Sequence, residues 1–325
     1  MTTVDNPGAD EALPSRGLIG PTIRLLVGPL AFLLMYFVIP LEGLEWNGRV
    51  VLATFVWMAA WWIAEPIPWA VTCVLPLALL PLLGVMRIDA VASLYGQNIF
   101  FWIWGTTMLG FAMAKHGLAH RLALWFLSQR GVANSTARLT FIYMLSAASI
   151  SSVVSDTAVV AMMMPIGMSL FAYVRETTGA GATGRSPLAA FLALSTLYGS
   201  QAGGVATIAG IPHNAVSISL LEKLTGRVVG FFEWMMVGVP LMVALLLSFY
   251  FLLRFFFPPE IKSIPGGEAF VRAERAKLGP VSAGERNVLI AFIMMVVLFV
   301  SPSIAGLVLG DSHPFAAGLR TALPI

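Results

Sequence analysis

The segment Ser-Ser-Val-Val-Ser-Asp-Thr at residues 151–157 interrupts a strongly apolar stretch of the chain with hydroxyl groups and one carboxyl group. A second interruption, Gly-Ser-Gln-Ala-Gly-Gly-Val-Ala-Thr at residues 199–207, is rich in glycine and is also flanked by apolar runs. In hydrocarbon every backbone amide needs a hydrogen-bonding partner, so polar groups at this depth face protein, water or a bound solute. The two interruptions therefore predict broken helical elements that build a solute site within a membrane.

Composition places the chain in a membrane. Of its 325 residues, 58% are hydrophobic and 11% are charged, whereas a soluble domain carries about 25% charged residues. We therefore predict an all-α, multi-pass integral membrane protein that is embedded in the lipid bilayer and has the bilayer as a partner. The net charge of +3 does not indicate nucleic-acid binding, because the basic residues lie between apolar segments rather than in one stripe.

The apolar runs before residue 118 predict four spans, at residues 22–40, 49–64, 68–84 and 98–114. Glu65-Pro66-Ile67-Pro68 is expected to form a tight turn between the second and third spans, because each proline lacks a backbone donor and restricts the residue before it. From Leu118 the pattern changes. Leu118, Leu122, Trp125 and Phe126 share helical spacing opposite basic residues, which predicts a short helix lying in the membrane interface.

The first interruption predicts a re-entrant hairpin with short apolar arms at residues 139–150 and 158–173. The second predicts a broken helix, with half-helices at residues 187–198 and 215–221. Further spans are expected at residues 241–257 and from residue 287 onward. With the N-terminus in the cytoplasm, most of the 19 Lys and Arg residues fall on the inner side, provided that the hairpin returns to its own side. The charge distribution thus favours re-entry and an inner or plasma membrane location with a cytoplasmic N-terminus.

Three motifs carry a resemblance to a known family. Ser155-Asp156-Thr157 and the apolar run after it resemble the Ser-Asn-Thr hairpin tip of the divalent anion:sodium symporter (DASS) family, which transports dicarboxylates, citrate and sulfate. The segment from Gly203 to Asn214 is similar to that family's G-G-x-x-T-x-x-G-x-P-x-N motif, and Trp61-Trp62-Ile63-Ala64-Glu65-Pro66-Ile67-Pro68 resembles its W-W-x-x-E-x-I-P turn. Three motifs in the right order are more specific than any one of them.

The resemblance implies a secondary active transporter that couples a cation, expected to be sodium with a proton as the alternative, to symport of a small divalent anion by an elevator-type motion. It implies a homodimer when complete. Family members continue with a second, inverted repeat, and neither motif recurs after residue 287. We therefore expect the first inverted repeat alone, either as a truncated sequence or as one half of a carrier completed by a second polypeptide.

These predictions divide the chain into seven segments. They are a cytoplasmic N-terminal tail (1–18), scaffold-type transmembrane helices (19–116), an interfacial helix (117–133), a transport-type segment with the hairpin and the broken helix (134–225), a transmembrane helix (226–258), a cytoplasmic loop (259–286) and the truncated start of a second half (287–325).

The resemblance also implies the site residues. The expected cation ligands are oxygen atoms of the hairpin tip and of the glycine segment, from Ser151, Ser155, Asp156, Gly203 and Gly204. The expected substrate-binding residues are Ser155, Asp156, Thr157, Thr207, Pro212 and Asn214. A hard cation prefers oxygen ligands, and helix N-termini attract anions. No catalytic residue, no cofactor and no metal other than the transported alkali cation is predicted.

Asp156 departs from the family pattern, which has a neutral asparagine at this position. A carboxylate at the tip repels a dianion. Either Asp156 binds a proton when the substrate binds, which brings a proton into the coupling, or the substrate is not a dicarboxylate.

Three alternatives remain open at this point. A sodium- or proton-coupled antiporter or an anion exporter of a related family would also use broken helices and an aspartate in the membrane. A membrane-embedded enzyme would use Asp156, but no histidine or cysteine stands beside it in the sequence. A subunit that only assembles with others would leave the two interruptions without a purpose.

Overall fold

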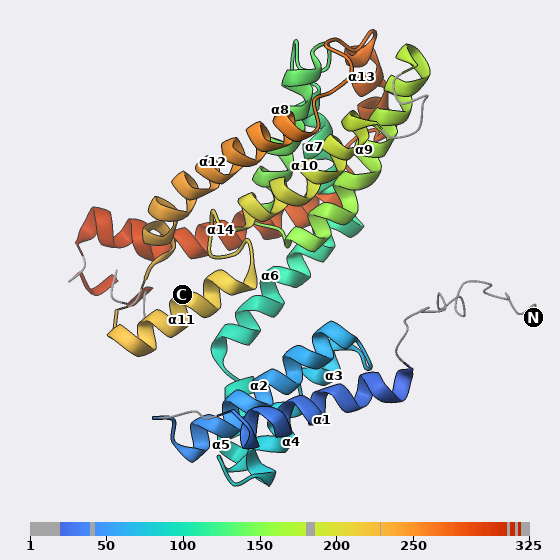
Figure 1. The fold of residues 1–325 in the computed structure, drawn as a ribbon. Helices are drawn as coiled ribbons and strands as arrows, with labels where there is room; N and C mark the ends of the chain where they lie inside the picture. Colours follow the sequence, from blue (N-terminus) through green and yellow to red (C-terminus); the bar gives the residue numbers. More distant parts are fainter. Residues whose placement is uncertain are drawn as a thin grey trace, which may run out of the picture. The chain divides into compact units, whose positions relative to one another are not determined.

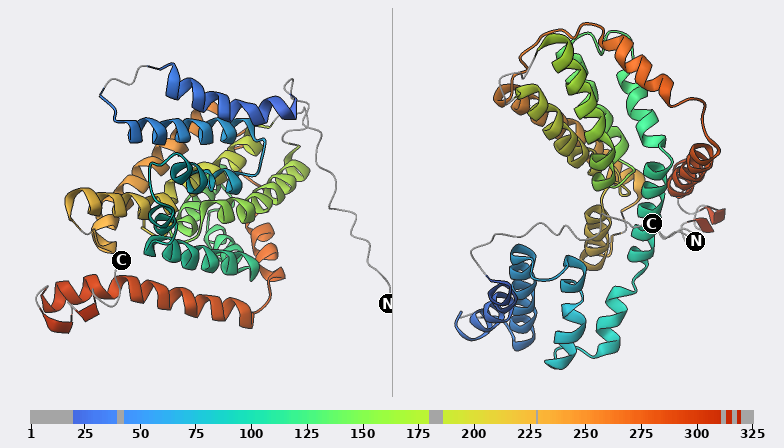
Figure 2. Two further views of the ribbon diagram at one scale, coloured as in Figure 1. Left: turned by 90° about the horizontal axis from the view of Figure 1, so that it is seen from below. Right: turned by 90° about the vertical axis from the view of Figure 1, so that its right-hand side faces the viewer.

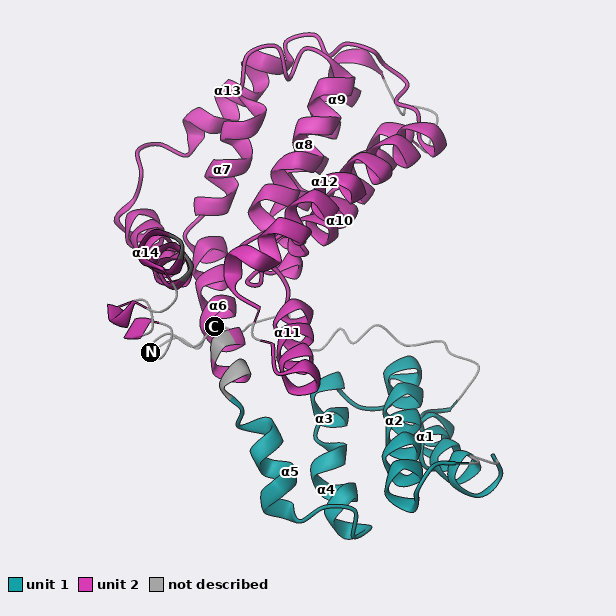
Figure 3. Cartoon of the chain, turned by 90° about the vertical axis from the view of Figure 1, so that its left-hand side faces the viewer, with its two compact units in different colours: residues 1–97 teal, residues 98–325 magenta. Residues whose placement is uncertain are grey.

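The computed structural model describes residues 20–39, 43–179, 186–227, 229–310, 313–315 and 318–319, and every regular element within them is a helix. The chain forms two compact units, residues 1–97 and 98–325 (Figure 3). The all-α prediction is confirmed for the described residues. The predicted N-terminal tail, residues 1–18, lies outside them.

The first unit begins with the antiparallel pair α1 (Pro21–Phe37) and α2 (Trp46–Ala64). Gly28 leaves room for two indole rings, because a Cβ atom at this position would lie 2.2 Å from Trp57 and 2.4 Å from Trp61. The Trp61 indole donates a hydrogen bond to the Leu25 carbonyl at 2.9 Å. Helix α2 ends at the predicted turn, where Glu65 adopts a left-handed conformation with φ 47°.

The apolar run at residues 68–84, predicted as one span, is broken in the structure, and its crossing of the membrane stays a prediction. The structure has two short helices here, α3 (Trp69–Thr72) and α4 (Leu75–Leu82), followed by α5 (Ile88–Tyr95), which the sequence did not predict. Pro76 explains the break, since proline lacks an N–H group and disfavours helical geometry in the residue before it. It therefore stands in the first turn of a new helix instead of continuing α3.

The second unit contains nine helices among its described residues (Figure 1): α6 (Asn98–Lys115), α7 (Leu118–Leu127), α8 (Thr136–Ser151), α9 (Asp156–Thr178), α10 (Pro187–Gly204), α11 (Pro212–Thr225), α12 (Phe231–Phe256), α13 (Gly267–Lys277) and α14 (Ala283–Leu309). Within the described residues, three helices are long and apolar enough to cross a membrane, at Asp156–Thr178, Phe231–Phe256 and Ala283–Gly306.

The expected arm lengths of the hairpin therefore need correction. Its first arm, α8, has 16 residues, but its second arm, α9, has 23 and is a candidate span by itself. The arm is longer than predicted because it includes Asp156 and Thr157 at its start and residues 174–178 at its end. Re-entry of the hairpin stays a prediction.

Helices α8, α9 and α10 pack around the Tyr143 side chain. This side chain is fully buried, and its hydroxyl group lies 2.7 Å from both the Met163 carbonyl oxygen and the Thr196 hydroxyl. Gly167 makes room for it, because a Cβ atom there would lie 2.5 Å from the Tyr143 oxygen. One residue of α8 thus fixes the distance to both neighbouring helices.

Helix α7 forms where the sequence predicts a short helix. Trp125 is 46% exposed, while small residues beside Leu118 are buried against α8 and α9. The buried residues are Leu118, Ala119, Ala123, Leu124 and Leu127. The interfacial position stays a prediction.

Residues 258–282, here called the cap segment, are more ordered than a loop, since they contain α13. The Glu260 carboxylate accepts hydrogen bonds from the Ser186 hydroxyl at 2.6 Å and the Leu188 amide at 3.2 Å, at the start of α10. The Lys262 carbonyl accepts one from the Thr136 amide at 3.2 Å, at the start of α8. The cap segment therefore holds the first turns of both helices.

The same segment also reaches α9 and the loop after α7 (Figure 2). The Tyr173 hydroxyl on α9 donates to the Pro265 carbonyl at 2.8 Å, and its ring stacks on Phe270 with the ring centroids 4.3 Å apart. The Glu268 carboxylate accepts a hydrogen bond from the Gly131 amide at 2.7 Å. Polar contacts thus fasten the hairpin and α10 together at the end opposite the two interruptions.

Arg121 on α7 connects this helix to the start of α14. Its guanidinium group contacts both oxygens of the Glu285 carboxylate, at 2.7 and 3.2 Å, and donates to the Gly279 carbonyl at 3.0 Å. The Glu285 side chain is 6% exposed and also accepts the Ser282 amide at 2.7 Å. A bidentate, shielded pair of this kind is strong as long as both partners remain.

We expect Arg121→Ala to lower the free energy of unfolding by about 2 kcal/mol, because it leaves a shielded carboxylate without its cation. Arg87→Ala is the matched control, since the Arg87–Asp89 pair is 87% and 67% exposed, and it should cost less than about 0.5 kcal/mol. Chemical denaturation in detergent measures both values. Equal losses of unfolding free energy in the two variants would contradict the conclusion that the Arg121–Glu285 pair is strong.

Candidate functional site

The two interruptions are shorter than the sequence predicts. Helix α8 ends at Ser151 and α9 begins at Asp156, so the hairpin turn comprises residues 152–155. Helix α10 continues through Gly203 and Gly204, and α11 begins at Pro212, so the helix is broken only at residues 205–211. The expectation that Gly203 and Gly204 are unwound is therefore wrong; they form the last turn of α10.

Close packing against α8 explains why α10 remains helical where it passes through its glycines. A Cβ atom at Gly203 would lie 2.0 Å from the Ala148 carbonyl oxygen, and one at Gly199 would lie 2.8 Å from the Met144 carbonyl oxygen. These pairs advance in the same direction along both helices, so α8 and α10 run parallel and end side by side. The glycines allow two helix C-termini to meet.

The two breaks are joined by hydrogen bonds. The Thr207 hydroxyl donates to the Ser152 carbonyl oxygen and accepts from the Ala209 amide at 3.1 Å. The Asn214 amide group donates to the carbonyl oxygens of Gly204, at 2.8 Å, and Thr207, at 2.7 Å. Thr207 and Asn214 are both only 5% exposed. In this structure their polar groups hold the backbone of the breaks, and contact with a substrate stays a prediction for both.

The paired C-termini of α8 and α10 provide features that suit a cation. Carbonyl groups at a helix C-terminus carry partial negative charge. The Ser151 hydroxyl is fully buried in the last turn of α8 and has no hydrogen-bonding partner in the described structure. A buried hydroxyl without a partner is costly unless something binds it. Ser151 is one of the predicted cation ligands.

The hairpin tip presents its polar groups at the start of α9. Ser155 is the residue before the helix, and its hydroxyl does not cap it. Asp156 accepts a hydrogen bond from the Thr157 amide at 2.8 Å and a second from the Gln201 side-chain amide of α10, also at 2.8 Å. The predicted residues Ser155, Asp156 and Thr157 therefore lie beside the end of α10.

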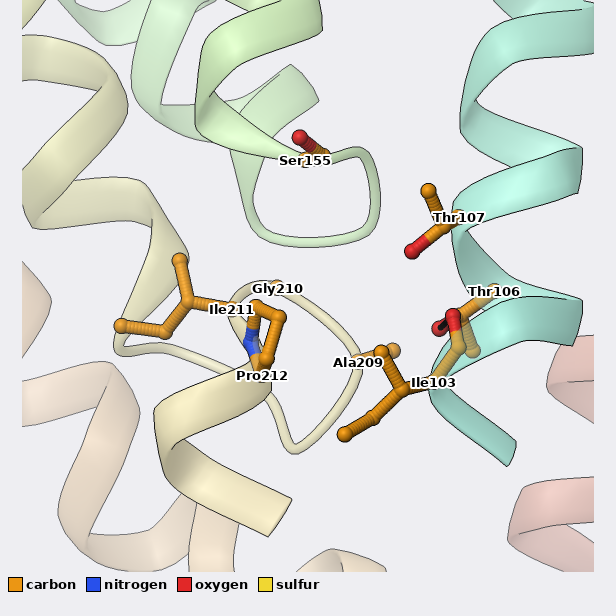
Figure 4. Close-up of a pocket in the computed structure, with 8 residues that line it drawn as sticks. All are labelled: Ile103, Thr106, Thr107, Ser155, Ala209, Gly210, Ile211 and Pro212. Atoms are coloured by element: carbon orange, nitrogen blue, oxygen red, sulfur yellow. Dashed lines mark hydrogen bonds between the residues drawn. The ribbon is translucent and has the colours of Figure 1, made fainter. Parts of the chain in front are cut away.

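A small pocket lies next to the tip (Figure 4). It is lined by Ser155, by residues 209–212 of the broken helix, and by Ile103, Thr106 and Thr107 of α6. Thr107 projects its hydroxyl group from α6 toward the space between the two loops. Because Ser155 precedes α9 and Pro212 begins α11, two helix N-termini with partial positive charge border this pocket.

Helix α12 supports the broken segment from another side. The Trp234 indole donates to the Val205 carbonyl at 3.0 Å. A Cβ atom at Gly238 would lie 2.7 Å from the same oxygen. The backbone oxygen released where α10 ends is therefore satisfied by a neighbouring helix, as required in a low-dielectric environment.

Sequence reasoning missed three contributors to this site. Gln201 stood within the quoted glycine segment but was assigned no role. Thr106 and Thr107 lie in an apolar helix after Gly105, where two adjacent hydroxyl groups at membrane depth were a detectable signal. Within the described residues, no group of three His, Cys, Asp or Glu side chains could hold a metal ion.

The fold and the two joined breaks define a class, the helical transmembrane region of an ion-coupled carrier. Comparison with known proteins agrees. Residues 22–308 match the sodium:sulfate symporter transmembrane region. The chain belongs to the sodium:sulfate symporter family. The resemblance carried by the three motifs is thus confirmed, and membership of a transporter family argues against an enzyme.

Two relatives are sodium-dependent dicarboxylate transporters named SdcS. The protein from Staphylococcus saprophyticus is 32% identical over 287 residues, which are 87% of this chain and 55% of that protein. The protein from Staphylococcus aureus strain NCTC 8325 is 32% identical over 286 residues, which are 87% of this chain and 54% of that protein. The chain spans about half the length of the curated relatives that it matches.

We predict that Thr207→Val loosens the broken segment, because the isosteric side chain cannot donate to the Ser152 carbonyl or accept from the Ala209 amide. Loss of hydrogen bonds worth about 1 kcal/mol should accelerate amide exchange at residues 205–211 by roughly fivefold to tenfold. Hydrogen-exchange mass spectrometry measures this rate. Thr207→Ser keeps the hydroxyl and should exchange like the unmodified protein; equal acceleration in both variants would contradict the assigned bond.

Proposed function

We propose that the protein is a secondary active transporter that couples sodium to the symport of a small anion, such as a dicarboxylate, citrate or sulfate. This proposal rests on one observation: the two helix breaks are hydrogen-bonded to each other. The C-termini of α8 and α10 and the N-termini of α9 and α11 therefore lie close together. This arrangement offers a place for a cation next to a place for an anion. The names of the two relatives support sodium and a dicarboxylate.

The cation site is proposed at the ends of α8 and α10. Ser151 supplies the buried hydroxyl without a partner, and Ser155 and Asp156 supply side-chain oxygens from the hairpin tip. Gly203 and Gly204 contribute backbone carbonyls from the last turn of α10. Sodium is a hard cation that prefers such oxygen ligands.

The anion site is proposed at the starts of α9 and α11. Ser155 and Thr157 bring hydroxyl groups to the tip, and Thr107 brings one from α6. Pro212 is the first residue of α11 and lines the same pocket. Thr207 and Asn214 contribute to substrate binding indirectly. They hold residues 205–211 in the conformation that places the start of α11 at the pocket.

Finer features of the mechanism follow from the family. We propose that the hairpin is re-entrant, that this chain forms the first inverted repeat, and that the hairpin and the broken helix move together in an elevator-type motion. We also propose that the N-terminus is cytoplasmic and that the complete protein is a homodimer. The basal contacts of the cap segment support joint motion, because they fasten α8, α9 and α10 to one another.

Sodium-dependent uptake into proteoliposomes tests the function directly. Purified protein is reconstituted, and uptake of radiolabelled succinate, citrate and sulfate is followed with an inward sodium gradient and with potassium replacing sodium. Uptake of one of these anions that requires sodium supports the proposal. Exchange of anions without any sodium requirement, or no uptake at all, would overturn it.

We predict that Ser151→Ala raises the sodium concentration for half-maximal uptake by about tenfold, corresponding to about 1.4 kcal/mol for one lost ligand. Ser146→Ala is the matched control, since Ser146 is equally buried on the same helix but its hydroxyl already donates to the Tyr143 carbonyl at 2.7 Å. It should change the value less than about twofold. Similar shifts in both variants would remove Ser151 from the cation site.

A further inference from the structure

Asp156 and Gln201 form a hydrogen-bonded pair across the two broken elements. Asp156 is the first residue of α9, and Gln201 lies in the last turns of α10. The Gln201 side-chain nitrogen donates to one carboxylate oxygen at 2.8 Å, and the Thr157 amide donates to the other at 2.8 Å. Both oxygens therefore accept hydrogen bonds, one from each of the two broken elements.

The charge of this carboxylate is not balanced by a cationic side chain. The ion pairs of the described residues join Arg87 to Asp89, Arg121 to Glu285, Arg227 to Glu233 and Lys277 to Glu274, and none includes Asp156. Its two partners are neutral amide groups. Asp156 is half-buried, while Gln201 and Thr157 are exposed, so a solute that reaches the tip meets a carboxylate with no cationic side chain of the described residues beside it.

The position of this charge decides its effect on an anion. At the first residue of α9 it lies on the partial positive charge of the helix N-terminus, which would otherwise attract an anion. A neutral amide at the same place would leave this attraction intact. With the same number of bound cations, the site therefore carries one unit of positive charge less than its asparagine-bearing equivalent.

We propose that the Asp156–Gln201 pair selects the charge of the substrate, so that the site accepts a singly charged carboxylate in preference to a dianion. This inference rests on the proposed function and refines its substrate class: a dicarboxylate would enter with one carboxyl group neutral. Gln201 is a positioning residue. It holds the carboxylate against α10, and without it the charged group can rotate toward the anion pocket.

A purely helix-stabilising role for Asp156 is the simpler alternative, because acidic residues are common in the first turn of a helix. Such a role predicts that Asp156→Asn lowers stability and transport without changing the relative uptake of anions of different charge. Charge selection predicts a change in that ratio. The two roles therefore differ in a measurable quantity.

The test compares succinate, a dianion, with monomethyl succinate, a monoanion of nearly the same shape, in sodium-driven uptake at pH 7.5. Unmodified protein should favour the monoanion. In Asp156→Asn the ratio of succinate to monomethyl succinate uptake should rise by about tenfold, because one unit of negative charge next to the anion pocket is removed. Asp89→Asn, which removes an exposed carboxylate in the first unit, should leave the ratio unchanged.

A double-mutant cycle tests the role of Gln201. Gln201→Leu should shift the ratio about threefold further toward the monoanion in the unmodified background and have no effect on the ratio in the Asp156→Asn background. Gln129→Leu, which removes a side-chain amide bonded to the Trp125 carbonyl at 3.0 Å, should have no effect in either. Equal shifts in both backgrounds would show that Gln201 does not act through Asp156.

Other outcomes of these uptake measurements also decide whether the inference holds. If uptake persists in Asp156→Asn with an unchanged ratio, the charge-selection inference is wrong while the proposed function stands. If Asp156→Asn folds but transports neither anion, sodium-dependent thermal stabilisation by each anion gives the ratio, and an unchanged ratio again overturns the inference. If unmodified protein takes up citrate or sulfate with a sodium gradient but neither succinate nor monomethyl succinate, the inference is wrong while the proposed function stands. If it takes up none of these anions, both fail.

Discussion

The hydrogen bond from the Thr207 hydroxyl to the Ser152 carbonyl joins two helix breaks that are far apart in the sequence. Each break frees backbone groups that a membrane environment does not satisfy. Here a hydroxyl group of the second break satisfies a carbonyl oxygen of the first, and Asn214 and Trp234 satisfy carbonyl oxygens at the end of α10. The polar residues of the interruptions are therefore first of all a requirement of the fold, and the site is built on that frame.

The direction of the helices then distributes charge around this frame. Because α8 and α10 run parallel, both end at the breaks, and the helices that follow them both begin there. Partial negative charge from two C-termini and partial positive charge from two N-termini thus lie close together. A cation and an anion bound at these places would attract each other, which provides the coupling free energy that symport requires.

The sequence located both breaks, because hydroxyl groups and glycines between long apolar runs at membrane depth are typical of interrupted helices. It misjudged their extent. Gly203 and Gly204 were predicted to be unwound, whereas their lack of a side chain serves the approach of α10 to α8, and only tertiary packing distinguishes these two uses of glycine. Gln201 was overlooked for a similar reason, since its partner lies 45 residues away. The cap segment looked like a charged loop because the contacts that hold it to α8, α9 and α10 are with residues far away in the sequence.

The contacts at the two ends of the second unit differ in kind. At the base, the cap segment uses charged and backbone groups with short, defined partners, such as Glu260 at the start of α10 and Glu268 at the Gly131 amide. At the breaks, Ser151 keeps a buried hydroxyl without a partner, and the carboxylate of Asp156 is bound by neutral amides alone. Because these groups at the breaks lack a full set of partners, a ligand bound there would stabilise the structure. Ions bound there would complete the polar contacts of the hairpin and α10 without disturbing the base, so these helices would remain one body while their charge changes.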